Sequence, residues 1–215
     1  APVLPQLGRH RGRVARQVRK LHVRDRSQRF RDIRLLLERG EASGVHPVTR
    51  LDRDTFGVVI LAKNANIHDR FCRMLRERQL EKTYLAAVFG QPPQENGQID
   101  LPVYKVGGGS LIRVVDERGQ KALTQYRVLK RAEKTALLEL HPLTGRTHQL
   151  RLHCMASGFP ILGDPQYTGP EAKAYSDAHG LQFQQLCAAR LVFPHPMTGE
   201  RIEICSKQTV FFPKD

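Results

Sequence analysis

The chain has 215 residues, of which 40% are hydrophobic, and a formal net charge of +14 at pH 7. This length suits one compact domain. No stretch approaches the roughly 20 apolar residues of a membrane helix. The Arg-rich start also lacks the apolar core of a secretory signal. We therefore expect a cytoplasmic protein outside the membrane. The basic charge predicts a polyanionic partner, nucleic acid first, because neutralised phosphates release condensed counterions.

The beginning of the chain differs from the rest. Residues 1–40 carry 12 Lys and Arg against 3 Asp and Glu, a net charge of +9. Such a segment can be a solvated or disordered basic arm, and it can also bind RNA. The two interpretations do not exclude each other. We divide the chain into an atypical Arg-rich segment, residues 1–44, and a folded domain, residues 45–215.

From residue 45 onward the pattern is typical of a folded domain that contains both helices and strands. Strands outnumber helices and lie close together in the sequence, which predicts an α+β fold with a mixed, largely antiparallel sheet flanked by a few helices. In chain order we expect a strand at 56–62, a helix from the cap Asn64 to about Gln79 and a strand at 83–89. A turn-rich stretch follows at 97–119 and contains the flexible loop Gly107-Gly108-Gly109. Strands at 124–129 and 136–140, a helix at 147–157 and strands at 186–193 and 201–205 complete the domain.

The cysteines give no sign of a metal or redox site. They are widely spaced and form no C-x-x-C pair, so buried, reduced thiols are expected at all four. They are Cys72, Cys154, Cys187 and Cys205.

Two segments concentrate charged side chains. Residues 46–57 (HPVTRLDRDTFG) place Asp52 and Asp54 just before a predicted strand, whose rigid edge could hold a charged group. Composition and spacing alone favour a solvated charged turn that leads into the strand.

The second segment is residues 144–153 (TGRTHQLRLH). His148 and Arg151 are three positions apart and share a helix face. His148 and His153 lack the H-E-x-x-H spacing of a zinc helix, whereas the bidentate fork of arginine suits anion binding or carboxylate pairing. No metal site is predicted.

Together, these residues resemble RNA pseudouridine synthases of the RluA/RluD type. Residues 50–57 (RLDRDTFG) resemble the family's R-L-D-x-x-T-S-G signature, and residues 81–90 (EKTYLAAVFG) resemble its K-x-Y-x-A-x-V-x-G strand. Residues 144–153 resemble its T-G-R-x-H-Q-I/L-R-x-H block, and residues 158–164 (GFPILGD) match the stretch that follows. The resemblance extends from about residue 45 to the C-terminus and implies the pseudouridine synthase catalytic fold.

The resemblance assigns roles to individual residues. It implies that Asp52 is the essential aspartate, that Tyr84 stacks on the target base and that Arg151 pairs with the aspartate. The expected RNA-binding residues are Arg50, Arg53, Arg146 and His148.

The implied reaction uses neither a metal nor a coenzyme, because the uracil leaves the sugar, turns and rejoins through C5 with nothing oxidised. Asp52 could attack the sugar or remove a sugar proton, and the sequence leaves both routes open. The target uridine must be flipped out of its stack to reach the site. RNA, ribosomal or transfer or both, is the expected partner, and a monomer without an obligate protein partner is the default.

The chain departs from the family pattern in three places. Thr49 stands where His or Asn is common, and Phe56 stands where Ser is common, so we expect altered packing or substrate choice with activity retained. Residues 1–44 show neither the apolar strand nor the Lys-Pro turn that usually precedes the aspartate motif.

Two alternative functions remain. One is a catalytically silent RNA-binding protein whose basic arm binds RNA. The other is a D-x-D phosphohydrolase, because Asp52 and Asp54 have that motif's spacing, although no strongly apolar strand precedes them.

Overall fold

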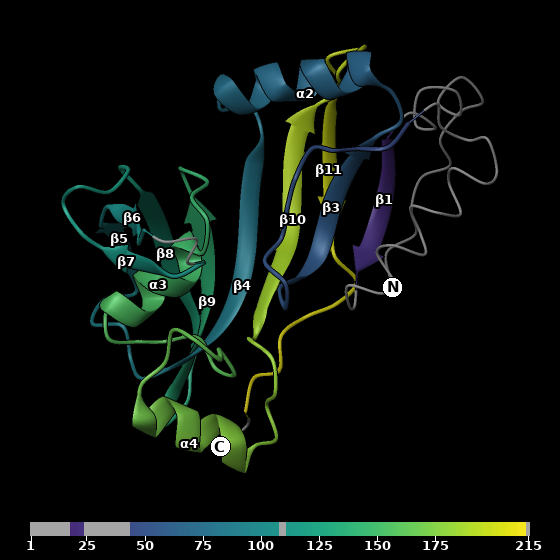
Figure 1. The fold of residues 1–215 in the computed structure, drawn as a ribbon. Coiled ribbons are helices and arrows are strands. Elements are labelled where there is room, and N and C mark those ends of the chain that lie inside the picture. The colour runs from purple at the N-terminus through teal and green to yellow at the C-terminus, as the bar shows by residue number, and fades with distance from the viewer. Residues whose placement is uncertain (1–17, 24–43, 108–110, 214–215) are drawn as a thin grey trace.

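The computed structural model describes residues 18–23, 44–107 and 111–213. In this part of the chain a nine-stranded sheet forms the body, three helices pack around it, and a separate two-stranded hairpin lies to one side (Figure 1). The strands are β1 (Val18–Val23), β2 (His46–Pro47), β3 (Phe56–Ala62), β4 (Glu81–Phe89), β5 (Asn96–Asp100), β6 (Val103–Lys105), β7 (Arg113–Val115), β8 (Leu123–Arg131), β9 (Thr135–Pro142), β10 (Leu186–Pro194) and β11 (Arg201–Cys205). The helices are α2 (Ala65–Arg76), α3 (Gln149–Ala156) and α4 (Pro170–Ala178).

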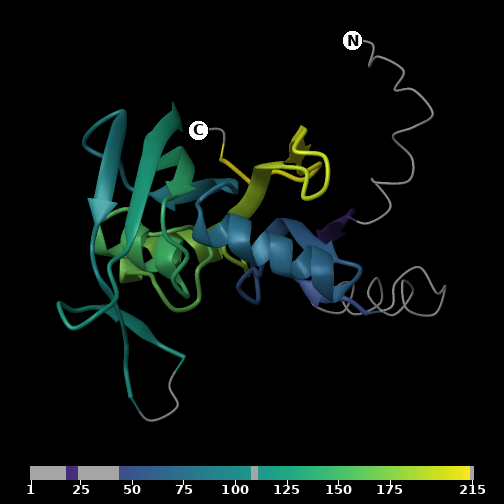
Figure 2. The ribbon, with the colours of Figure 1, turned by 90° about the horizontal axis from the view of Figure 1, so that it is seen from above.

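The sheet is mixed and largely antiparallel. Its strand order is β1-β3-β10-β4-β9-β8-β5, with β2 paired to β3 and β11 paired to β10. The short β3–β10 pairing is parallel, and the other described pairings are antiparallel. The predicted α+β architecture is therefore confirmed. The β6–β7 hairpin forms its own sheet and projects from the body, as the view from above shows (Figure 2).

Most of the predicted elements are present near their expected bounds. β3 and β11 coincide with their predictions, and Asn64 caps α2 by accepting a hydrogen bond from the amide of Ile67 at 3.0 Å. α2 ends at Arg76, three residues earlier than expected, and Arg78 then takes a left-handed conformation with φ of 56°. The apolar periodicity located the helix, but its end depends on this local backbone geometry.

Several elements were not expected from the sequence. The turn-rich stretch contains β5, β6 and β7, and α4 follows it further along the chain. β5 (NGQID) has a polar sequence of low strand propensity and becomes a strand through its pairing with β8. Of the predicted Gly107-Gly108-Gly109 loop, the last two residues lie outside the described part of the chain.

The N-terminal segment needs one correction. Residues 18–23, which the sequence suggested would form no strand of the domain, form β1 and pair with β3 along six residues. The remaining residues of the Arg-rich segment 1–44, apart from Gly44, lie outside the described residues. The division of the chain at residue 44 stays a prediction.

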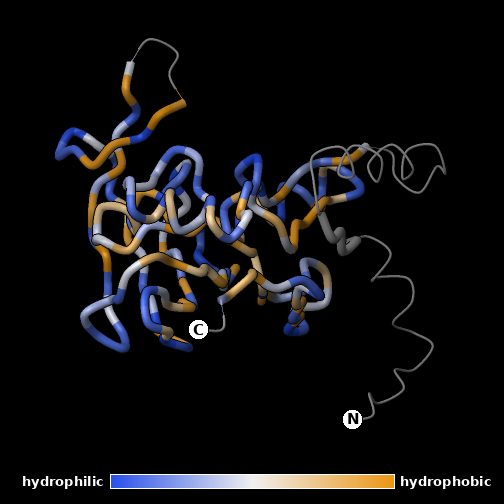
Figure 3. Tube along the Cα trace, turned by 90° about the horizontal axis from the view of Figure 1, so that it is seen from below, coloured by the Kyte–Doolittle hydropathy of each residue, from blue (hydrophilic) through white to orange (hydrophobic). Residues whose placement is uncertain are grey.

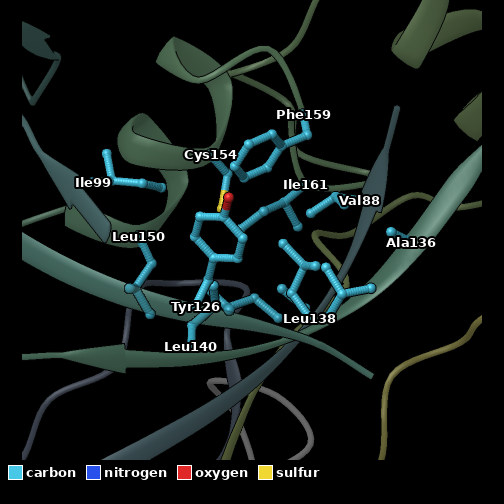
Figure 4. Close-up of a cluster of buried hydrophobic side chains, with 13 residues drawn as sticks. Val88, Ile99, Tyr126, Ala136, Leu138, Leu140, Leu150, Cys154, Phe159 and Ile161 are labelled. Atoms are coloured by element: carbon cyan, nitrogen blue, oxygen red, sulfur yellow. The ribbon is translucent and has the colours of Figure 1, made fainter. Parts of the chain in front are cut away.

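Two hydrophobic clusters support opposite parts of the sheet. One lies between β4, β8, β9 and α3, where Tyr126 and Phe159 meet edge to face at 5.6 Å between ring centroids (Figure 4). The other joins α2 to β3 and β10, with Phe71 against Phe193 at 5.3 Å. Hydrophobic residues follow the strands in the interior, and many of the loops are hydrophilic (Figure 3).

The cysteines only partly follow the expectation. Cys154 and Cys187 are buried and Cys72 is half-buried, but Cys205 is exposed, and all four are free thiols. Cys205 ends the edge strand β11, whose residues alternate between exposed and half-buried positions. The prediction of buried thiols was therefore wrong for Cys205.

Gly57 makes the parallel junction of β3 and β10 possible. Its φ of 114° disfavours any side chain, and a Cβ there would lie 2.7 Å from the backbone nitrogen of Ala188, inside van der Waals contact. Ala188 is its partner in the register. The close approach of the two strands therefore requires glycine at this position.

We predict that Gly57→Ala destabilises the protein by at least about 2 kcal/mol, because it adds both backbone strain and steric overlap. For a chain of this size the melting temperature should fall by roughly 5 °C, which calorimetry would measure. Gly107→Ala is the matched control, since a Cβ at Gly107 meets open space. Equal melting temperatures for the two variants would contradict the prediction.

Candidate active site

A cavity of about 200 Å³ opens where the loop before β3, the strand β4 and the segment before α3 meet. It brings together residues from four separate stretches of the sequence: 48–55, 82–84, 142–150 and Leu186. Of the predicted site residues, Arg50, Asp52, Tyr84, Arg146 and His148 line it.

Two predicted residues do not line the cavity. Arg151 is buried and is not part of the cavity lining, but its guanidinium lies next to Asp52. Arg53 points elsewhere: its side chain is 72% exposed and pairs with Asp54 at 3.3 Å. The structure therefore groups six of the seven predicted residues around one cavity and separates Arg53 from them.

Asp52 occupies a loop that buried contacts hold in place. The amide of Thr55 donates to the backbone carbonyl of Asp52 at 3.2 Å, and the hydroxyl of Thr55 accepts from Gln184 Nε2 at 2.5 Å. On the other side of the loop, Thr49 Oγ1 accepts from the amide of Ile60 at 2.9 Å. Thr49, which departs from the family pattern, thus ties this loop to β3.

The guanidinium of Arg151 lies near two carboxylates, and it is closer to one than to the other. Its Nε and Nη2 donate to the two carboxylate oxygens of Asp164 at 2.6 and 2.8 Å, whereas its Nη1 lies 3.6 Å from Asp52. The side chain of Asp164 is fully buried, and that of Asp52 is 24% exposed. Asp164 is therefore the structural partner of Arg151, and Asp52 keeps a face toward the cavity.

Tyr167 packs beside this ion pair. Its amide donates to Asp164, and the guanidinium carbon of Arg151 lies 4.9 Å from the centroid of its ring. Its hydroxyl lies 2.9 Å from His148 Nδ1. The ring therefore contacts both polar residues that the sequence predicted on one helix face, although His148 is the N-cap of α3 and lies outside the helix.

Gln149 organises the loop ahead of α3. Its side-chain oxygen accepts from the hydroxyl of Thr144 at 2.8 Å and from the amide of Arg146 at 3.0 Å. Its Nε2 donates to the Leu123 carbonyl and the Thr124 hydroxyl, each at 3.0 Å. This buried amide uses its whole hydrogen-bonding capacity to shape one wall of the cavity.

Tyr84 and Lys82 alternate along β4 and both line the cavity. Burial raises the pKa of Tyr84 above its usual value, and the negative charge of Asp52 raises it further, so the phenol stays protonated at neutral pH. Burial lowers the pKa of Lys82. Among the described residues Lys82 has no ion-pair partner.

The cavity is positively charged overall. Its lining holds three cationic side chains, Arg50, Lys82 and Arg146, against the single carboxylate of Asp52. Such a surface attracts an anionic ligand, and an aromatic side chain such as Tyr84 can stack on a planar base. A nucleotide combines both features.

Comparison with known proteins decides the family. Residues 16–156 match the family described as RNA pseudouridylate synthase. The chain belongs to the RNA pseudouridylate synthase family. The predicted family and the predicted enzyme class, a pseudouridine synthase, are thereby confirmed, and nothing supports the silent RNA-binding or phosphohydrolase alternatives.

Named relatives agree with this membership. The chain is 41% identical over 158 residues to the dual-specificity RNA pseudouridine synthase RluA of Yersinia pestis, covering 73% of this chain and 75% of that one. It is 34% identical over 166 residues to ribosomal large subunit pseudouridine synthase C of Vibrio vulnificus, covering 77% of this chain and 52% of that one. The chain thus spans between half and three quarters of the length of these relatives.

A solved structure shares the fold of this pseudouridine synthase. Human RNA pseudouridylate synthase domain containing 1 superposes with a TM-score of 0.70 at 27% identity, covering 89% of this chain and 79% of that one.

Of the helices in the described part of the chain, none has the length and hydrophobicity that a membrane span requires. The same residues hold no cluster of three or more potential metal ligands.

Sequence reasoning named no role for four residues that build the site. Three of them lie inside the motif blocks that carry the family resemblance, so this position in the sequence could have indicated a role in the site. They are Lys82, Gln149 and Asp164. Tyr167 lies outside the blocks and shows no local pattern. Its role follows from contacts that only the folded chain makes.

We predict that Asp164→Asn destabilises the synthase by about 3 kcal/mol, because it leaves the buried guanidinium of Arg151 without its main counter-charge. Asp52→Asn is the matched control and should cost about 1 kcal/mol or less, since this pair is longer and partly exposed. Urea denaturation measures both free energies of unfolding. A larger loss for Asp52→Asn would show that Asp164 is not the structural partner.

Proposed function

We propose that this chain isomerises specific uridines of ribosomal RNA, transfer RNA or both to pseudouridine, with Asp52 as the catalytic carboxylate. One observation carries the assignment: a carboxylate and the aromatic Tyr84 line one cationic cavity, with the guanidinium of Arg151 beside the carboxylate. The names of the two bacterial relatives, one dual-specific and one ribosomal, support these RNA classes.

The cavity suits a flipped uridine. The uracil would stack on Tyr84 while its ribose approaches Asp52, which acts as a nucleophile at C1′ or as a base on a sugar proton. The N1–C1′ bond breaks, the uracil turns and a C5–C1′ bond forms. C5 then loses its proton and N1 carries one, so the reaction is balanced without an oxidant or a co-substrate.

Arg151 would position Asp52. Because Asp164 already holds the guanidinium in a bidentate pair, Arg151 attracts Asp52 without enclosing it. The carboxylate therefore stays oriented and open to the sugar. Arg50 and Arg146, which line the cavity, would contact the RNA backbone, and Arg53 would bind RNA outside it. The expectations of a monomer and of a cytoplasmic location stay predictions.

We predict that Asp52→Asn abolishes isomerisation and leaves RNA affinity within about threefold, because phosphate contacts supply most of the affinity. Tritium release from RNA labelled at uridine C5 measures the reaction, with a metal chelator present and absent. Asp54→Asn is the matched control, since Asp54 is two residues away and outside the cavity lining. Full activity in the Asp52 variant would refute the proposed role.

We predict that Arg146→Gln weakens RNA binding about equally for different sequences and lowers the slope of log affinity against log salt by about one. The reason is that a phosphate contact neutralises one charge whatever the base. Arg201→Gln is the control, because Arg201 lies on β11 and is not part of the cavity. An unchanged slope in Arg146→Gln would exclude a phosphate contact.

A further inference from the structure

The hydroxyl of Tyr167 sits between two nitrogen atoms. It lies 2.9 Å from the backbone nitrogen of Arg113, at the start of β7, and 2.9 Å from Nδ1 of His148. A backbone N–H can only donate, so the Tyr167 oxygen accepts from Arg113. The direction of the second hydrogen bond then depends on where the hydroxyl proton goes.

Burial decides that direction. Tyr167 is 4% exposed, and within the described residues its hydroxyl has no third partner. If His148 Nδ1 carried a proton and donated to Tyr167, the hydroxyl proton would be buried without an acceptor, which is costly. Every group is satisfied only when Tyr167 donates to an unprotonated Nδ1. His148 then carries its proton on Nε2.

The surroundings keep His148 uncharged. Burial lowers its pKa, and the positive charges of Arg151 and Arg113 lower it further, while Asp52 and Asp164 act in the opposite direction. The net shift is downward from the usual value of 6.5. At neutral pH the ring is therefore neutral, with one acceptor nitrogen used by Tyr167 and one donor nitrogen remaining.

That remaining donor belongs to a residue at the cavity wall. His148 lines the cavity, and in the described part of the chain its Nε2 has no hydrogen-bond partner. It stands at the N-cap of α3 in a left-handed conformation, with φ of 57°, yet its side chain does not cap the helix. A strained backbone at this point is consistent with a side chain held for another purpose.

We infer that Tyr167 fixes His148 as the neutral tautomer with its proton on Nε2, and that this N–H donates a hydrogen bond to an oxygen of the nucleotide in the cavity. The second part rests on the proposed function. The acceptor is either the ribose 2′-hydroxyl or a uracil carbonyl, which present the same chemistry to the N–H. Tyr167 is thus a positioning residue that acts through His148.

The first test is a measurement on the free protein. Nitrogen-15 NMR of the labelled chain at pH 7 should show His148 neutral with its proton on Nε2, and Tyr167→Phe should leave a mixture of tautomers. Tyr126→Phe removes a hydroxyl from the core and should leave His148 unchanged. A proton on Nδ1, or a charged ring, in the parent protein overturns the inference even if the enzyme is active.

The pH dependence has a definite sign. Donation from the hydroxyl stabilises the neutral ring, so removing it in Tyr167→Phe should raise the pKa of His148 toward 6.5. Any property that needs neutral His148 is present above this pKa and lost as the pH falls through it. The acid limb of the kcat profile should therefore move to higher pH in Tyr167→Phe and stay in place in Tyr126→Phe. An unmoved limb counts against the inference.

The second test asks what receives the hydrogen bond. His148→Ala should weaken binding of substrate RNA about tenfold, whereas His148→Gln, whose amide can donate from a similar position, should stay within about threefold. The binding is then repeated with 2′-deoxyuridine, 2-thiouridine or 4-thiouridine at the target position. Each modified nucleotide alters one of the possible acceptor oxygens. The loss of affinity caused by His148→Ala should disappear only for the nucleotide whose altered group is the acceptor. A penalty unchanged for all three overturns this part. Because the tautomer is measured without substrate, failure of the proposed function would remain distinguishable.

Discussion

The buried pair of Arg151 and Asp164 is the interaction on which the site depends. A guanidinium beside a carboxylate at a cavity could enclose it in a bidentate pair and block it. Here Asp164 takes the two shortest hydrogen bonds, and Asp52 receives only the remaining edge at 3.6 Å. The cost of burying both charges is offset by their mutual pairing and by the amides of Gln166 and Tyr167, which also donate to Asp164.

The sheet positions Asp52 relative to Tyr84. Asp52 precedes β3, and Tyr84 lies on β4, which is separated from β3 only by β10. The parallel contact of β3 with β10 requires the bare backbone of Gly57, so this glycine allows the loop of Asp52 and the strand of Tyr84 to lie on either side of β10. Rigid strands therefore position groups that belong to separate segments of the chain.

The β6–β7 hairpin is connected to the same site. It projects from the body, yet the amide of Arg113 at the start of β7 bonds to the hydroxyl of Tyr167, which contacts both His148 and Arg151 (Figure 2). A chain of direct contacts thus runs from the hairpin to the neighbours of Asp52. The cationic lining of the cavity attracts phosphate, while the hydrogen bonds around Tyr167 set the protonation of one ring.

The sequence by itself determined the family and the main strands, because apolar runs and motif spacing are local properties that survive without a structure. It also predicted Asp52 as the catalytic carboxylate. Only the tertiary structure decided that Arg53 lies away from the cavity, that Asp164 holds Arg151, and that Tyr167 faces His148. It also showed that polar segments such as β1 and β5 join the sheet. The reason is physical: partner choice and edge pairing depend on contacts between residues far apart in the chain, which no local pattern encodes.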